Sequence, residues 1–130
     1  MKRAYLAFIF LTITTVLPFC KKSSDIQGLI IGRWKIDSTQ VVTSPYAYET
    51  VYKPEADYYE FTKDTLVVTW GGSPYGGIDY KIVSSNGKLL IQYPPNTSGG
   101  NPDTIMNLSD HFLILNTAHI SVSKIFMTKQ

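Results

Sequence analysis

The sequence predicts an all-β protein: an antiparallel up-and-down β-barrel of about eight strands, with a short N-terminal helical turn. Apolar and polar residues alternate with a period of two from Gly32 onward, and no segment shows a sustained helical repeat. Turn-forming residues separate these short runs at steady spacing. Short strands with regular turns are typical of a sandwich or an up-and-down barrel, and closure into a barrel removes exposed sheet edges.

The individual elements are predicted from local patterns. Ser24 and Gln27 have the spacing of a capping box, which predicts a helical turn or two over residues 25–31. Trp34 and Ile36 share one face of the first strand, and Asn86-Gly87 is a strong hairpin signal. Further strands are expected near residues 41–48, 58–61, 65–70, 78–82, 89–93, 104–108, 112–115 and 119–127. Turns or loops are expected at 71–77 and 94–103, and a loop or an irregular hairpin at 45–57.

The first 19 residues have the layout of a secretory signal. Lys2 and Arg3 precede an apolar run of about 16 residues, shorter than the roughly 20 that a membrane-spanning helix needs. The run ends at Cys20, the only cysteine of the sequence. A lone cysteine has no partner for an intramolecular disulfide, which favours modification of its thiol. The alternative is an uncleaved membrane segment in which Cys20 is simply a small apolar residue.

The rest of the chain is expected to form one domain. Residues 20–25 predict a short polar tether and residues 26–130 a single β domain, since about 110 residues suit one hydrophobic core. Lys2 and Arg3 lie in the signal, so the mature chain carries equal numbers of basic and acidic residues. This balance of charges gives no support to nucleic-acid binding. We expect the protein to be a monomer.

The signal resembles that of a bacterial lipoprotein, in which a diacylglycerol is attached to the cysteine that becomes the first residue. The resemblance implies cleavage after Phe19 and lipidation of Cys20, with acyl chains such as palmitate holding the protein on a membrane. It implies a location in the bacterial cell envelope. Lys21 after the cysteine resembles the sorting signal for the outer membrane.

The segment 29–38 contains Gly32-Arg33-Trp34 and resembles the opening of a lipocalin-type barrel. Together with the later strands, it resembles the lipocalin-like domain of small bacterial lipoproteins. The resemblance implies that Trp34 plugs one end of the barrel and that a basic residue of the last strand stacks on its ring. Lys124 is expected to take this role, because alternation places it on the apolar face with Ile120, Val122 and Phe126. The alternative leaves Lys124 in solvent.

Catalysis has little support in the sequence. His111 and His119 are the only histidines, and their spacing is not that of a metal site. No nucleophile elbow or phosphate-binding loop occurs. We therefore expect no enzyme activity, no metal and no cofactor.

Aromatic residues are the suggestive feature. The residues expected to point into the barrel either line a ligand pocket or fill the core: Tyr59, Phe61, Trp70, Tyr80 and Tyr93. Five tyrosines also fall within residues 46–59, and tyrosine combines an apolar face with a polar group suited to binding surfaces. These residues suggest two functions. The first is non-catalytic binding of a small apolar or amphipathic ligand. The alternative is a filled barrel that acts as a protein-interaction or inhibitor module, binding an envelope protein through the loops 45–57 and 94–103.

Overall fold

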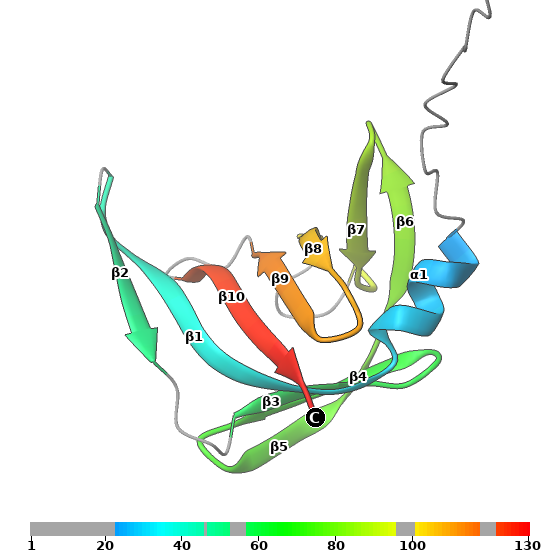
Figure 1. Ribbon diagram of the computed structural model, residues 1–130, viewed down its shortest axis with the longest axis horizontal. Coiled ribbons are helices and arrows are strands. Elements are labelled where there is room, and N and C mark those ends of the chain that lie inside the picture. Colours follow the sequence, from blue (N-terminus) through cyan, green and yellow to red (C-terminus); the bar gives the residue numbers. More distant parts are fainter. Residues whose placement is uncertain (1–22, 46, 53–56, 96–100, 118–121) are drawn as a thin grey trace, which may run out of the picture.

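Ten antiparallel strands form one curled sheet with a short helix beside it (Figure 1). This computed structural model describes residues 23–45, 47–52, 57–95, 101–117 and 122–130. The predicted all-β class and the N-terminal helical turn are confirmed. The elements are α1 (Ser23–Ile30), β1 (Gly32–Ser44), β2 (Ala47–Tyr52), β3 (Tyr58–Phe61), β4 (Thr65–Trp70), β5 (Ser73–Asp79), β6 (Lys81–Ser85), β7 (Lys88–Gln92), β8 (Asp103–Leu108), β9 (Phe112–Asn116) and β10 (Val122–Lys129).

The strand order is that of a meander whose first and last strands pair. It runs β5-β4-β3-β1-β10-β9-β8-β7-β6, and β2 pairs with β1 beside this path. The two ends of the order, β5 and β6, are consecutive in the chain. In the described residues no strand pairing joins them. The sheet therefore curls into a half-barrel that is joined where the first and last strands pair and is open between β5 and β6, and we call this opening the seam.

Two segments expected as turns or loops contribute strands, which raises the count above the expected eight. β2 pairs antiparallel with the second half of β1, in agreement with the irregular hairpin that was one of the two alternatives open from the sequence. The turn predicted over 71–77 is present only at Gly71 and Gly72, both with positive φ, and the rest of that prediction is wrong because β5 begins at Ser73. Pro74 is tolerated in β5 because this strand lies at an edge of the sheet.

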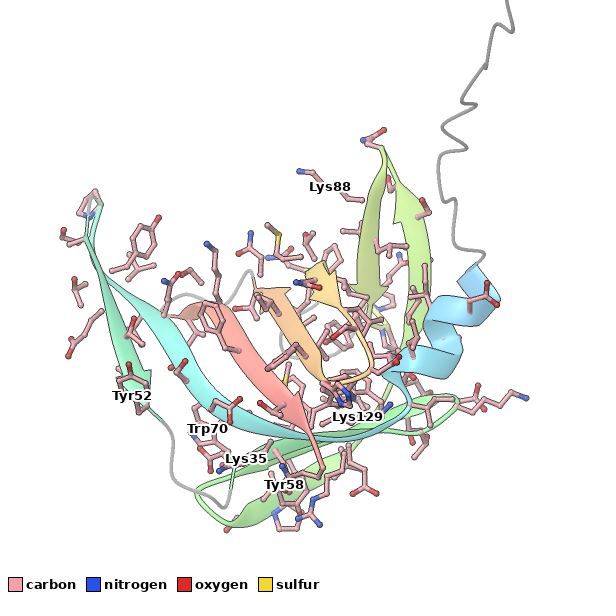
Figure 2. The ribbon with its side chains drawn as sticks, viewed as in Figure 1. Lys35, Tyr52, Tyr58, Trp70, Lys88 and Lys129 are labelled. Carbon is pink, nitrogen blue, oxygen red and sulfur yellow. The ribbon has the colours of Figure 1, made fainter. Side chains whose placement is uncertain are left out.

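The predicted hairpin at Asn86-Gly87 is confirmed. Both residues have positive φ, as a type I′ turn requires, and β6 and β7 pair on either side of them. Figure 2 shows Lys88 near the tip of this hairpin.

The core lies on the concave side of the sheet. Trp34 and Ile36 are fully buried there, which confirms the predicted face of the first strand. Other strands and the corner between β5 and β6 add side chains to the same cluster: Tyr59, Phe61, Leu66, Tyr80, Ile91, Ile105, Leu113, Leu115, Ile125 and Met127. Ile30 of α1 completes the cluster, so the helix packs onto one end of the curled sheet.

The closed end of the barrel is built around Trp34. Its indole Nε1 donates to the carbonyl oxygen of Ile30 at 2.7 Å, and the Lys129 ammonium donates to that of Leu29 at 2.9 Å. The same ammonium lies 5.1 Å from the centre of the Trp34 ring. The last carbonyls of a helix lack intrahelical partners and carry partial negative charge, so an N–H donor and a cation stabilise them.

Gly32 gives the lysine side chain room to reach the helix. A Cβ added at Gly32 would lie 2.9 Å from Cε of Lys129, and the φ of Gly32 is +130°. The glycine of the Gly-x-Trp motif is thus needed both for its backbone conformation and for the close approach of Lys129.

The expectation that Lys124 stacks on Trp34 is wrong, because Lys129 pairs with Trp34 across β1 and β10. Lys124 instead pairs with Gln40. The error comes from Ser123, which has no partner in the β1–β10 register and shifts the alternation of β10 by one residue. Beyond this bulge Ile125 and Met127 are buried, not Phe126. Ile120 lies outside the described residues.

The helix also begins earlier than expected. It starts at Ser23, within the segment 20–25 that the sequence predicts as a tether. Gln27 does not reach back to close a capping box: its side-chain amide donates to the carbonyl oxygen of Lys63 at 2.7 Å. In the described part of the chain, no helix has the length and apolar character needed to cross a membrane.

The contact at the closed end predicts a specific loss of stability. Lys129→Met keeps most of the apolar stem but removes the cation, the contact with Trp34 and the hydrogen bond to Leu29. We expect the free energy of unfolding in urea to fall by about 1–2 kcal/mol. Lys124→Met is the matched control on the same strand, with an expected change within about 0.5 kcal/mol. Equal losses in both variants would contradict this account.

Candidate functional site

Tyr80 occupies the corner between β5 and β6 and is held on three sides. Its N–H donates to the carbonyl oxygen of Asp64 at 3.1 Å, and its hydroxyl donates to that of Thr62 at 2.6 Å. The ring meets Phe61 edge-on, with centroids 5.3 Å apart and planes at 78°. Burial, with a smaller effect of the Asp64 charge, raises the pKa of Tyr80. The phenol is thus a fixed, neutral group at the seam of the barrel.

Tyr93 follows the end of β7 and is oriented by a buried carboxylate. Its hydroxyl donates to Oδ2 of Asp103 at 2.8 Å, and Asp103, the first residue of β8, is only 2% exposed. Burial raises the pKa of Tyr93, and the adjacent negative charge of Asp103 raises it further. A hydrogen bond to a charged acceptor is stronger than a neutral one, so it fixes the orientation of the Tyr93 ring.

Tyr59 is a second phenol influenced by the same carboxylate. Burial raises the pKa of Tyr59, with a smaller contribution from Asp103. The ring of Tyr59 packs against Phe61, with centroids 6.1 Å apart, and Tyr59 lies opposite Trp34 in the β1–β3 pairing. The row of aromatic residues therefore extends from the closed end of the barrel toward the seam.

A cleft of about 430 Å³ opens beside Tyr80 and Tyr93. Its walls come from the β5–β6 corner and from the end of β7: Asp79, Tyr80, Lys81, Gln92, Tyr93, Pro94 and Pro95. Tyrosine and proline rings offer apolar surfaces, while Asp79, Lys81 and Gln92 supply a charge of each sign and an amide. This combination suits a small molecule with an apolar body and one or two polar groups.

A second hollow adjoins the first. Its volume is about 390 Å³, and it shares Tyr80 and Lys81 with the cleft. The remaining walls are Gln27 of α1 together with Lys63, Asp64, Ile82 and Val83. The hydrogen bond from Gln27 to Lys63 holds the helix against the turn between β3 and β4 on this side. Lys81 is therefore accessible from both hollows.

The five aromatic residues expected in a pocket have different positions. Tyr93 is partly buried and lines the cleft, whereas Tyr80 borders the cleft but is only 4% exposed and belongs to the core cluster. Tyr59 and Phe61 are buried in the core, so the barrel is filled at their level. Trp70 is partly buried and packs against the edge of the core.

Sequence patterns alone do not select Asp103, Pro94 or Pro95. All three lie in the segment 94–103, which the alternation pattern places in a loop. Only the fold brings Asp103 next to Tyr93, through the pairing of Asp103 with Ile91. The one local signal is the pair Pro94-Pro95, which indicates a rigid segment after the strand because proline fixes φ.

The described residues hold no group of three or more His, Cys, Asp or Glu side chains placed to bind a metal ion. His111 is exposed in the turn between β8 and β9. His119 lies outside the described residues.

Comparison with known proteins supports the fold. Neither a family model nor a curated protein matches the sequence. The structure is similar to that of a lipocalin-like protein from Bacteroides uniformis, with a TM-score of 0.50 and 15% identity over 77% of this chain and 97% of the other. An uncharacterized protein from Bacteroides eggerthii has a TM-score of 0.47 and 16% identity over 77% of this chain and 98% of the other. The first similarity shows that the fold is lipocalin-like.

The buried phenols predict a dependence of stability on alkaline pH. Folding raises the pKa of Tyr59 and of Tyr93 above their ordinary value of 10. The folded chain keeps protons that the unfolded chain releases, so stability is full below about pH 10 and falls as the pH rises further. Tyr93→Phe removes one such proton. Above pH 10, its free energy of unfolding should therefore fall less steeply, by up to about 1.4 kcal/mol per pH unit.

Urea denaturation between about pH 8 and 11 measures this slope, and comparison of slopes separates it from the loss of the hydrogen bond to Asp103. Tyr48→Phe, at a position 64% exposed, is the control. Identical slopes in the Tyr93→Phe variant and the unsubstituted chain would show that the Tyr93 phenol does not act in this way.

Proposed function

We propose that this protein is a non-catalytic binding protein that takes a small amphipathic ligand in the cleft between Tyr80 and Tyr93. The observation that carries the proposal is the cleft itself, whose volume of about 430 Å³ and ring-lined walls suit a small molecule. Ligand sites are commonly concave, mainly apolar and mostly formed in advance, with a few polar groups that orient the ligand. The lipocalin-like fold is compatible with such a role, although fold alone assigns no ligand.

The filled interior moves the proposed site away from the centre of the barrel. Phe61 is 1% exposed and Tyr59 is 6% exposed, and their rings occupy the space that a central ligand would need. The cleft lies instead at the seam, where the sheet order ends. A ligand there contacts the partly buried Tyr93 ring, whose orientation is fixed by the hydrogen bond to Asp103. Fixed rings lose little conformational freedom on binding.

We further propose that the protein is exported and held on the bacterial envelope by lipid at Cys20, on the outer membrane. This proposal rests on the signal-like segment and on the position of the cysteine. Two or more acyl chains give stable anchoring, whereas one chain gives reversible binding. An anchor so close to α1, which begins at Ser23, would hold the domain near the membrane surface.

A second candidate function is protein binding through the tyrosine-rich segment. Tyr48 and Tyr52 on β2 are 64% and 80% exposed, far more than the aromatic residues of the core such as Tyr59 and Phe61. Exposed aromatic residues are typical of surfaces that bind proteins. This role would leave the cleft unused, so ligand-binding measurements distinguish the two functions.

The cleft can be tested with an amphipathic probe. We expect the full chain in detergent micelles to bind 1-anilinonaphthalene-8-sulfonate, measured by calorimetry against the detergent alone. Lys81→Phe should weaken this binding about tenfold or more, because the ring fills the cleft that Lys81 lines. Lys88→Phe, which makes the same change on an exposed residue at the hairpin tip, is the matched control. Equal affinities in the two variants, or no binding by the unsubstituted chain, would exclude the cleft as the site.

Lipidation has a separate test. The chain expressed in a bacterium grown with an alkynyl palmitate analogue should carry the label, and Cys20→Ala should lose it. Cys20 is the only cysteine, so no second thiol can take its place. Equal labelling of both chains would rule out the anchor without affecting the ligand proposal.

A further inference from the structure

Strand β2 has a free edge. It pairs with β1 from Ser38 to Ser44, and among the described residues no other strand pairs with it. In Figure 1, β2 lies at the margin of the molecule, with no element beyond it. A free edge presents unpaired backbone N–H and C=O groups, which can pair with another strand.

The other two edges of the sheet differ from β2 in sequence. β5 contains Pro74 and the pair Gly76-Gly77, which oppose further strand pairing. β6 begins at Lys81, and a charge on an edge strand has a similar effect. By contrast, β2 reads Ala-Tyr-Glu-Thr-Val-Tyr, with no proline or glycine and with one charge, Glu49. β2 therefore lacks the proline and glycines of β5, and its one charge limits the registers in which it can pair.

The outer face of β2 is also unusually apolar for a surface. Tyr48 is 64% exposed and Tyr52 is 80% exposed, and Figure 2 shows Tyr52 on this strand. Val42 lies opposite Tyr48 on β1 and is 40% exposed. These three side chains share one face, since Tyr48 and Tyr52 are four residues apart on a strand. Aromatic cross-strand pairs would cover much of this surface.

The sequence of β2 is complementary to itself in one antiparallel register. A two-fold axis through Thr50 places Thr50 opposite Thr50 of the second strand. It also places Tyr48 of each strand opposite Tyr52 of the other. The same register places Glu49 opposite Val51 of the other strand, so no like charges face each other. Shifting the axis to Glu49 would oppose two carboxylates, and shifting it to Val51 would shorten the overlap. A two-fold axis between two neighbouring residues would place the face of one strand that carries Tyr48 and Tyr52 beside the face of the other that carries Glu49 and Val51.

We propose that β2 pairs antiparallel with β2 of a second copy of this chain, centred on Thr50, to form a dimer with one continuous sheet. This goes beyond the ligand-binding proposal and does not depend on it. It also replaces the monomer expected from sequence. The strand is short and its interface is smaller than that of permanent dimers, so the association is weak and concentration-dependent.

The register makes a sharp test possible. Thr50→Cys, in the full chain with Cys20→Ser and in detergent micelles, places two thiols directly opposite each other. Opposed Cα atoms in an antiparallel pair lie about 4.5–5.5 Å apart, within the range of a disulfide. We expect mild oxidation to yield a covalent dimer several-fold more efficiently than with Ser73→Cys, an exposed position on β5. Glu49→Cys, which should lie opposite Val51 and not its own copy, should also give little dimer.

Sedimentation of the chain without added cysteines gives an independent measurement. We expect the dimer fraction to rise with protein concentration. Thr50→Lys, which opposes two ammonium groups at the axis, should abolish it, while Ser84→Lys on β6 leaves it unchanged. Circular dichroism of both lysine variants verifies that each remains folded. A monomer at every concentration, a dimer that persists in Thr50→Lys, or equal disulfide yields at positions 50 and 73 would overturn the proposal.

Discussion

The contact of Lys129 with Trp34 and the end of α1 is the interaction on which the rest of the structure depends. It joins the first strand, the last strand and the helix at one point. Because β1 and β10 are separated by nearly the whole domain, their pairing closes the largest loop in the fold and has the largest entropic cost of closure. Burial of Trp34, with satisfied donors on both the indole and the ammonium, offsets this cost. With β1 paired to β10, the other strands extend the sheet on both sides of this pair and curl around the core.

Sequence alternation predicts most of the fold and fails where a single residue interrupts it. The faces of Trp34 and Ile36, the turn at Asn86-Gly87 and the short helix could all be predicted, because each rests on local chemistry. The face of β10 could not, since Ser123 is an extra residue whose effect depends on its partner strand. Nor could β5, whose glycines and proline resemble a turn until its place at the sheet edge is known. Bulges and edges are properties of pairs of strands, and one strand's sequence does not contain them.

The residues of the candidate site could be predicted from the sequence only in part, because their positions also depend on which strands pair. Tyr93 could be selected as an aromatic residue on an inward face, but nothing local distinguishes it from Tyr59, Phe61 or Tyr80, which belong to the core. The difference arises after the end of β7, where Tyr93 is only partly buried and borders the cleft. Asp103 had no signal at all, since an aspartate after a proline resembles a turn. Its burial beside Tyr93 becomes visible only with the β7–β8 pairing.

The position of the seam connects the cleft to the free edges of the sheet. The first and last strands of this barrel are joined, and the interruption falls between β5 and β6. An interruption requires unpaired edges, and the residues at each edge decide which partner that edge can accept. Proline and glycine in β5 and lysine in β6 oppose the pairing of another strand there, and the cleft for which we propose a small ligand lies beside the corner that joins these two strands. Strand β2 has neither proline, glycine nor lysine and carries exposed tyrosines, so it is at this unpaired edge that we propose the pairing of a second chain.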